Sequence, residues 1–288
     1  MFETQEMWDV SLFFYVIICN TMYYLMFVEP VFKTYLFYYK LVPLIISFNE
    51  RLFVKTFSVD HGNHPSIGYV IGRIIPGGLL PQYKGLSGPE MRNIIQSGIN
   101  VKSDPIEVLE VAYTGDTCAN GLLLKKDIMN ETKFSINEEK RWIHLTQAFQ
   151  APLILCELTF LASSTDQNHL SQSLARKSGH LHIDDIDQIF SSHGWDLVSS
   201  TATIPIDVKI IFFHLSNRYA PASRLLNLIA SGLPKKLINN AEVALSSFIG
   251  TGKVEKCEEI VKNCLKENGC VTLSDYLEMQ ANKIDFQD

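Results

Sequence analysis

The chain has 288 residues, of which 47% are hydrophobic and 19% charged, a composition typical of a globular protein with a buried core. Its formal net charge of −6 excludes a surface that is basic throughout, so contact with nucleic acid would need a local patch. The six cysteines include no Cys-x-x-Cys pair, which favours reduced thiols and an intracellular compartment. Cytoplasm, nucleus and organelle are not distinguished by the sequence.

Residues 1–47 form a hydrophobic N-terminal segment unlike the rest of the chain. The run from Trp8 to Val28 is long enough to span a bilayer, although Asp9 and Asn20 interrupt it. No basic region precedes this run and no small-residue cleavage site ends it, so a cleavable signal peptide is not indicated. Three interpretations stay open: a membrane anchor through residues 8–28, a buried hydrophobic hairpin, and an aberrant start joined to an incomplete domain.

The hydrophobic pattern changes after this segment. Residues 51–59 and 67–75 are β-branched and aromatic runs, and the residues between them, "DHGNHPS", have the chemistry of a loop. Residues 88–98 predict a short helix with Pro89 near its start and Gly98 after its end. Residues 107–117, "EVLEVAYTGDT", predict a strand that runs into a turn.

The alternation continues to the C-terminal part of the chain. A Ser-x-x-Glu capping box at Ser135 and Glu138 predicts a helix start, and residues 151–160 predict a buried strand. Another helix, another strand and a further helix are predicted over 182–195, 206–216 and 220–232. Continuous apolar strands that alternate with helices predict an α/β fold, with sheets covered by helices.

Polar side chains of metal-ligand type follow several of these predicted strands. His61, Asp116, Glu157 and His214 each lie at or just past the end of a strand, and His180 lies where one helix gives way to another. Sites in layered α/β folds gather at such strand ends. A single histidine there is more often hydrogen-bonded structure than a ligand, but four polar residues at equivalent positions favour a hydrolytic zinc site.

Several motifs, in order, resemble the C-terminal half of the short, plant-like form of tRNase Z, an endoribonuclease of the metallo-β-lactamase fold. They are "AYTGDT", "CELTF", "SGHLHIDDI" and "FFHLSNRY", preceded by "KTFSVDHGNHPSIGYVI" and the connecting stretch "YKGLSGPEMRNIIQSGINV". The resemblance covers about residues 41–248. It implies an αββα sandwich of which the first-sheet half is missing, with a domain over 48–250 and a helical tail over 251–288.

The resemblance also decides how "GHLHIDDI" is interpreted. The family's main zinc motif, His-x-His-x-Asp-His, follows an early strand, whereas this stretch comes late and has Asp185 in place of the last histidine. In the family, the first histidine of this later slot acts with the glutamate of the E-x-T-F strand in proton transfer. The resemblance therefore implies His180 and Glu157 as catalytic residues. We expect His182 and Asp184 to be solvent-facing residues at the start of a helix.

The family's main zinc motif is absent from the sequence, because His61 is its first histidine. The residues that match family ligands are His61, Asp116 and His214. Two zinc ions, as in the family, share about seven protein ligands, and three residues cannot complete both shells. We therefore expect weak zinc binding and little turnover by this chain alone.

The resemblance implies zinc-dependent cleavage of precursor tRNA after the discriminator nucleotide, with Arg218 and Tyr219 near the phosphate. The missing ligands fit a truncated gene model, a complementing partner or second copy of the chain, or real loss. The alternative is a non-catalytic binding protein, free or tethered to a membrane. Its amphipathic tail would then either contact a partner or, as we favour, pack on its own domain. A third option is another metallo-β-lactamase-fold hydrolase.

Overall fold

The structure is a computed structural model. It describes residues 52–62, 64–123, 143–161, 172–195, 208–245, 258–266 and 270–284. The chain divides into two compact units, Met1–Leu44 and Ile45–Asp288, and all described residues belong to the second. The predicted hydrophobic segment 1–47, with its candidate span at residues 8–28, lies outside the described residues, as does the capping box at Ser135. Among the helices that the structure describes, none combines the length and apolar character needed to cross a bilayer.

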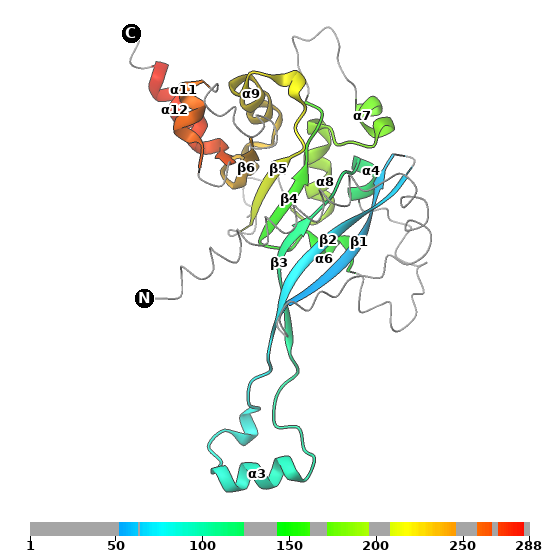
Figure 1. The fold of residues 1–288 in the computed structure, drawn as a ribbon, viewed down its shortest axis with the longest axis vertical. Coiled ribbons are helices and arrows are strands. Elements are labelled where there is room, and N and C mark those ends of the chain that lie inside the picture. The colour runs from blue at the N-terminus through cyan, green and yellow to red at the C-terminus, as the bar shows by residue number, and fades with distance from the viewer. Residues whose placement is uncertain are drawn as a thin grey trace, which may run out of the picture. The chain divides into compact units, whose positions relative to one another are not determined.

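The described residues form one seven-stranded sheet, in which the strands lie side by side in sequence order (Figure 1). The strands are β1 (Leu52–His61), β2 (His64–Ile75), β3 (Ile106–Tyr113), β4 (Leu153–Glu157), β5 (Lys209–Phe213), β6 (Ala241–Ala244) and β7 (Cys270–Thr272). Strands β3, β4, β5 and β6 pair in parallel, whereas β1–β2, β2–β3 and β6–β7 pair antiparallel. The five strands predicted from the sequence are present. The predicted loop 60–66 is shorter than expected, because pairing of β1 with β2 continues to His61 and His64.

Short helices connect the strands. They are η1 (Pro81–Tyr83), α3 (Gly88–Gln96), α4 (Ala119–Leu122), α6 (Leu145–Ala148), α7 (Gln172–Ser178), η3 (Ile183–Asp185), α8 (Ile186–Ser192), η4 (Asn217–Tyr219), α9 (Ala222–Gly232), η5 (Lys235–Asn240), α11 (Glu259–Cys264) and α12 (Leu273–Ile284). The helices predicted over 88–98, 182–195 and 220–232 correspond to α3, to η3 with α8, and to α9. The architecture is mixed α/β, which confirms the predicted class and is consistent with a metallo-β-lactamase-like fold.

The core lies against one face of the sheet. Strand register places Val70, Ala112, Ile154, Ile210 and Ala241 in one row across five strands, and each is almost completely buried. They share one hydrophobic cluster with buried residues of α4, α8 and α9. The neighbouring row, on the opposite face, includes Tyr113, Leu155 and Ile211, which are apolar and only half-buried. One face of the sheet is therefore sealed and the other is partly open.

Helix α3 lies in the connection between β2 and β3 (Figure 1). Its N-terminus carries a capping box, in which Glu90 accepts hydrogen bonds from the backbone and hydroxyl of Ser87. None of the residues of α3 is buried. The helix is therefore specified by local chemistry rather than by packing.

The described part of the tail packs on the same sheet. Strand β7 extends the sheet beyond β6, and α12 follows it directly. Val261 of α11 and Tyr276 of α12 are completely buried in the hydrophobic cluster. The four described cysteines, including Cys264 and Cys270 of this region, are buried. The apolar side of the described tail is thus covered by its own domain.

Candidate functional site

The ends of four strands bring the predicted site residues together. His61 ends β1 and Glu157 ends β4, whereas Asp116 and His214 follow β3 and β5. Strands β3, β4 and β5 are parallel neighbours, so their carboxyl ends lie at one edge of the sheet. His180 reaches the same edge from the connection between α7 and η3.

Glu157 lies at the centre of this cluster. Its side chain is fully buried, and its two oxygens accept hydrogen bonds from several parts of the chain. Oε2 accepts from the backbone N–H of Thr117, and the Thr159 hydroxyl lies 2.7 Å from Oε1. The backbone N–H of Leu181 adds a longer bond of 3.4 Å to Oε1. A buried carboxylate needs such donors, because desolvation without them is costly.

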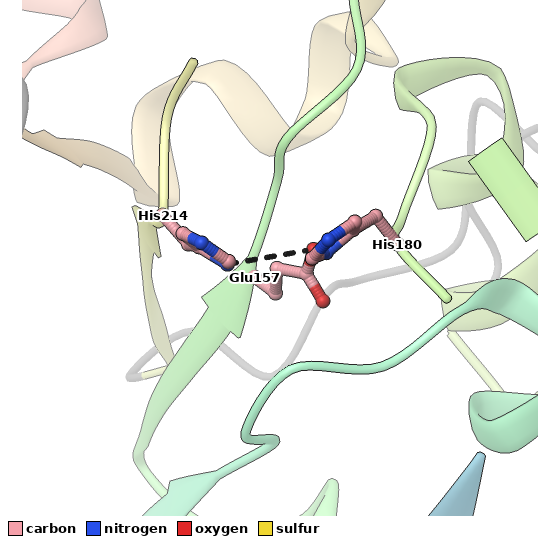
Figure 2. A group of neighbouring side chains, drawn as sticks. All are labelled: Glu157, His180 and His214. Atoms are coloured by element: carbon pink, nitrogen blue, oxygen red, sulfur yellow. Dashed lines mark hydrogen bonds and ion pairs between the residues drawn. The ribbon is translucent and has the colours of Figure 1, made fainter. Parts of the chain in front are cut away.

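Two imidazoles lie on either side of the Glu157 carboxylate (Figure 2). The Nδ1 atom of His180 is 2.6 Å from Glu157 Oε1, and Nδ1 of His214 is 3.7 Å from the same oxygen. Because a carboxylate only accepts hydrogen bonds, the short contact places a hydrogen on Nδ1 of His180. The other ring nitrogen of His180 is then the one available for proton exchange.

Asp116 extends the cluster on the His214 side. Its Oδ1 is 3.0 Å from Nδ1 of His214. Burial opposes ionisation of Asp116, but the hydrogen bond from His214 and nearby imidazoles lower its pKa. The same hydrogen bond, partly opposed by burial, raises the pKa of His214. The geometry therefore favours an ion pair between Asp116 and His214.

The backbone at His214 has a conformation that non-glycine residues seldom adopt. Its φ angle is 60°, and it is the non-glycine residue with positive φ among those described. Such strain often marks functional sites, where the surrounding structure maintains it. Here the Thr159 hydroxyl lies 2.9 Å from the carbonyl oxygen of His214 and ties this turn to the residues that follow β4.

Two glycines allow His61 to approach His180. Gly179 has a φ angle of 85°, and a Cβ atom there would lie 2.9 Å from Cγ of His61. Gly62 has a φ angle of 66° and faces the backbone of residues 177–179. The rings of His61 and His180 consequently meet edge to face, with centroids 5.0 Å apart. The rings of His180 and His214 are 5.1 Å apart.

The donors in this cluster are of the type that zinc prefers. Among the described residues, the group whose donor atoms all lie within 4.8 Å of one another is Glu157, His180 and His214. Glu157 is already engaged by the donors around it, whereas the His214 and Asp116 side chains are 42% and 35% exposed. Solvent, and hence an ion, can reach His214 and Asp116 more readily. The three side chains Glu157, His180 and His214 could hold one ion, but they are too few for two.

The two residues expected near the phosphate have different surroundings. Arg218 is exposed; its guanidinium lies 5.3 Å from the centre of the Phe160 ring, and its Nε donates to Ser216 Oγ. The Phe160 ring is 6.0 Å from that of His180, so Phe160 neighbours both Arg218 and the cluster. Tyr219 is buried, and its hydroxyl bonds to the backbone N–H and carbonyl of Leu161. The structure thus places Tyr219 in the core and Arg218 at the surface.

The prediction for His182 was wrong, because this side chain is 3% exposed rather than solvent-facing. Residues on both sides of His182 bond to the backbone of Phe160, which draws His182 inward. Its Nδ1 accepts from the backbone of Asp184, and Asp184 itself is exposed as expected. His182 therefore caps η3 from inside the protein.

Sequence reasoning missed the threonines that surround Glu157. Thr117 and Thr159 belong to "TGDT" and "CELTF", which were singled out for their acidic residues. The hydroxyl of Thr114 accepts from the backbone of Glu157 at 3.1 Å. The signal that could have found them is that threonines lie close to acidic residues at the ends of apolar strands, because a buried acid needs hydrogen-bond donors.

No family model matches the chain. The chain is similar to tRNase Z TRZ1 of Arabidopsis thaliana, with 33% identity over 137 residues. The match covers 48% of this chain and 40% of the relative, so the chain spans less than half of that protein. This similarity supports a distant relationship with tRNase Z and with metallo-β-lactamase-like proteins.

Proposed function

We propose that the cluster around Glu157 is part of a tRNase Z-type site that hydrolyses a phosphodiester bond at the 3′ end of precursor tRNA. The observation that carries this proposal is the 2.6 Å contact of His180 with a fully buried glutamate, beside the His214–Asp116 pair. The distant similarity to tRNase Z TRZ1 supports the substrate class. Fold class alone would not, because one fold hosts many activities.

In this proposal, His180 is the general acid. Glu157 accepts the Nδ1 hydrogen and thereby fixes the orientation of the ring. A proton on Nε2 can then pass to the oxygen that departs from phosphorus. Glu157 stabilises the charged imidazole, and its own position is held by Thr117 and Thr159. General acid catalysis of this kind contributes about 10²- to 10⁴-fold in rate.

His61, Asp116 and His214 are the residues that would hold zinc. A zinc ion bound there would supply positive charge to the phosphate and would lower the pKa of a bound water. Because three donors do not complete two shells, a fragment carrying the family's His-x-His-x-Asp-His motif would be required for full activity. We also propose that Arg218, whose guanidinium lies beside Phe160, binds a phosphate oxygen, since guanidinium and phosphate geometries match.

A reconstitution experiment tests the proposal. The chain is mixed with zinc, a labelled precursor tRNA and a tRNase Z fragment that carries His-x-His-x-Asp-His. We expect cleavage after the discriminator nucleotide, reduced by at least about 100-fold in His180→Ala and Glu157→Gln. The matched control is His144→Ala, which removes an exposed histidine outside the cluster. Cleavage that is equal in His180→Ala and wild type would refute the assigned role.

A further inference from the structure

A half-buried ion pair spans the segment that carries His180. Nη2 of Arg176, in the last turn of α7, donates to Oδ1 of Asp185 in η3. The Asp185 side chain is completely buried, whereas that of Arg176 is 34% exposed. The second oxygen of Asp185 has no hydrogen-bond partner in the described part of the chain. The Asp185 carboxylate therefore depends on Arg176.

The segment between these two residues is held unevenly. On the η3 side, the backbone around His182 bonds to Phe160, and Leu181 bonds to Glu157. On the α7 side, Ala175 is the residue of the helix that is buried. His180 itself connects to α7 through a 2.9 Å bond from its backbone N–H to the carbonyl of Ala175. The ion pair is thus a side-chain link between α7 and η3 across His180.

Stability alone is a weak explanation for such an ion pair. Removing a charge such as that of Asp185 from water costs free energy that attraction to a partner often does not recover, and apolar replacements are commonly as stable. In some proteins, such an ion pair instead defines the relative position of the two elements that carry it. Here those elements flank the residue whose Nδ1 must stay 2.6 Å from Glu157.

We propose that Arg176 and Asp185 are positioning residues, whose ion pair fixes the connection between α7 and η3 so that His180 stays hydrogen-bonded to Glu157. The catalytic meaning of this geometry rests on the proposed function, but the geometry itself can be measured without turnover. Neither residue belongs to the cluster that would contact substrate. Their substitution should therefore change which ring nitrogen of His180 carries hydrogen, while Glu157 and its threonine partners stay in place.

Nuclear magnetic resonance of the full chain labelled with ¹⁵N-histidine tests this proposal. The ring ¹⁵N signals of His180 are identified as those that disappear in His180→Gln. We expect wild type to show the form with hydrogen on Nδ1, because Glu157 accepts that hydrogen. In Asp185→Asn and Arg176→Met, we expect this pattern to be lost in favour of the Nε2–H form or an average of the two. Arg176→Lys, which keeps the positive charge, should retain the wild-type pattern. Lys177→Met, at the exposed neighbouring position of α7, should also leave it unchanged.

Two outcomes would overturn the proposal. The first is an unchanged His180 pattern in Asp185→Asn or Arg176→Met while thermal unfolding remains cooperative. The second is loss of cooperative folding in both variants, because the ion pair would then support the whole domain rather than this connection. Failure of the reconstituted cleavage assay, with the His180 pattern still dependent on Asp185, would refute the proposed function and leave the positioning role standing.

Discussion

Replacing Glu157 with glutamine is the substitution whose cost the structure defines best. Each short hydrogen bond to the carboxylate loses the strengthening that comes from charge, about 1 kcal/mol per bond. The amide also brings two N–H groups to a position surrounded by donors, including the backbone of Thr117 and Leu181. One buried donor left without an acceptor costs about 1–3 kcal/mol. Burying an amide is easier than burying a charge, which offsets part of the loss. We expect the free energy of unfolding to fall by about 2–4 kcal/mol.

Urea unfolding followed by circular dichroism measures this change. Glu278→Gln is the matched control, because it makes the same chemical change at an exposed position of α12, and its effect should stay within about 0.5 kcal/mol. If Glu157→Gln were as stable as the control, the carboxylate would not be held by the donors that the structure places around it.

Three further predictions concern the site and its support. In Gly179→Ala, the new Cβ would lie 2.8 Å from the carbonyl carbon of His61, and the alanine would have to adopt the φ angle of 85° that Gly179 has. The free energy of unfolding should therefore fall by about 1–3 kcal/mol. Unchanged stability in urea unfolding would argue against the contact. Burial, partly offset by a backbone hydrogen bond to Leu122, lowers the pKa of His193. On acidification the unfolded chain therefore binds a proton at His193 before the folded chain does, and stability should fall as pH drops below about 6.5. Thermal melts across about pH 5 to 8 should show this trend, and His193→Gln should weaken it. Metal analysis after dialysis should find fewer than two zinc ions per chain, decreased further in His214→Ala; two tightly held ions would show that other residues ligate.

The strand framework could be predicted because its signals are local. Strands β4 and β5 are mainly apolar runs; β4 ends at Glu157, and His214 follows β5 directly. Parallel pairing then brings such residues to one edge of the sheet, so their convergence followed from order alone. Strands β6 and β7 were missed because they have four and three residues, too few to show a periodic pattern.

What the sequence could not predict depends on contacts between distant segments. The donors to Glu157 include Thr117 and Leu181, which are 40 and 24 positions away, and no local pattern predicts them. His182 lies in a polar stretch that suits an exposed helix start, but bridging to Phe160 overrides that preference and buries it. The ion pair of Arg176 with Asp185 joins residues nine positions apart, on elements whose packing decides whether they meet. Such tertiary effects override local propensity.

The central claim is that His180, held by Glu157, gives a proton to the oxygen that departs from phosphorus. Single-turnover cleavage by the reconstituted site tests it with two precursor tRNAs, one natural and one with sulfur in place of the departing oxygen. Sulfur leaves readily without protonation, so the claim predicts that His180→Ala slows the natural substrate by about 10²- to 10⁴-fold and the sulfur substrate hardly at all. Equal slowing of both substrates would contradict it.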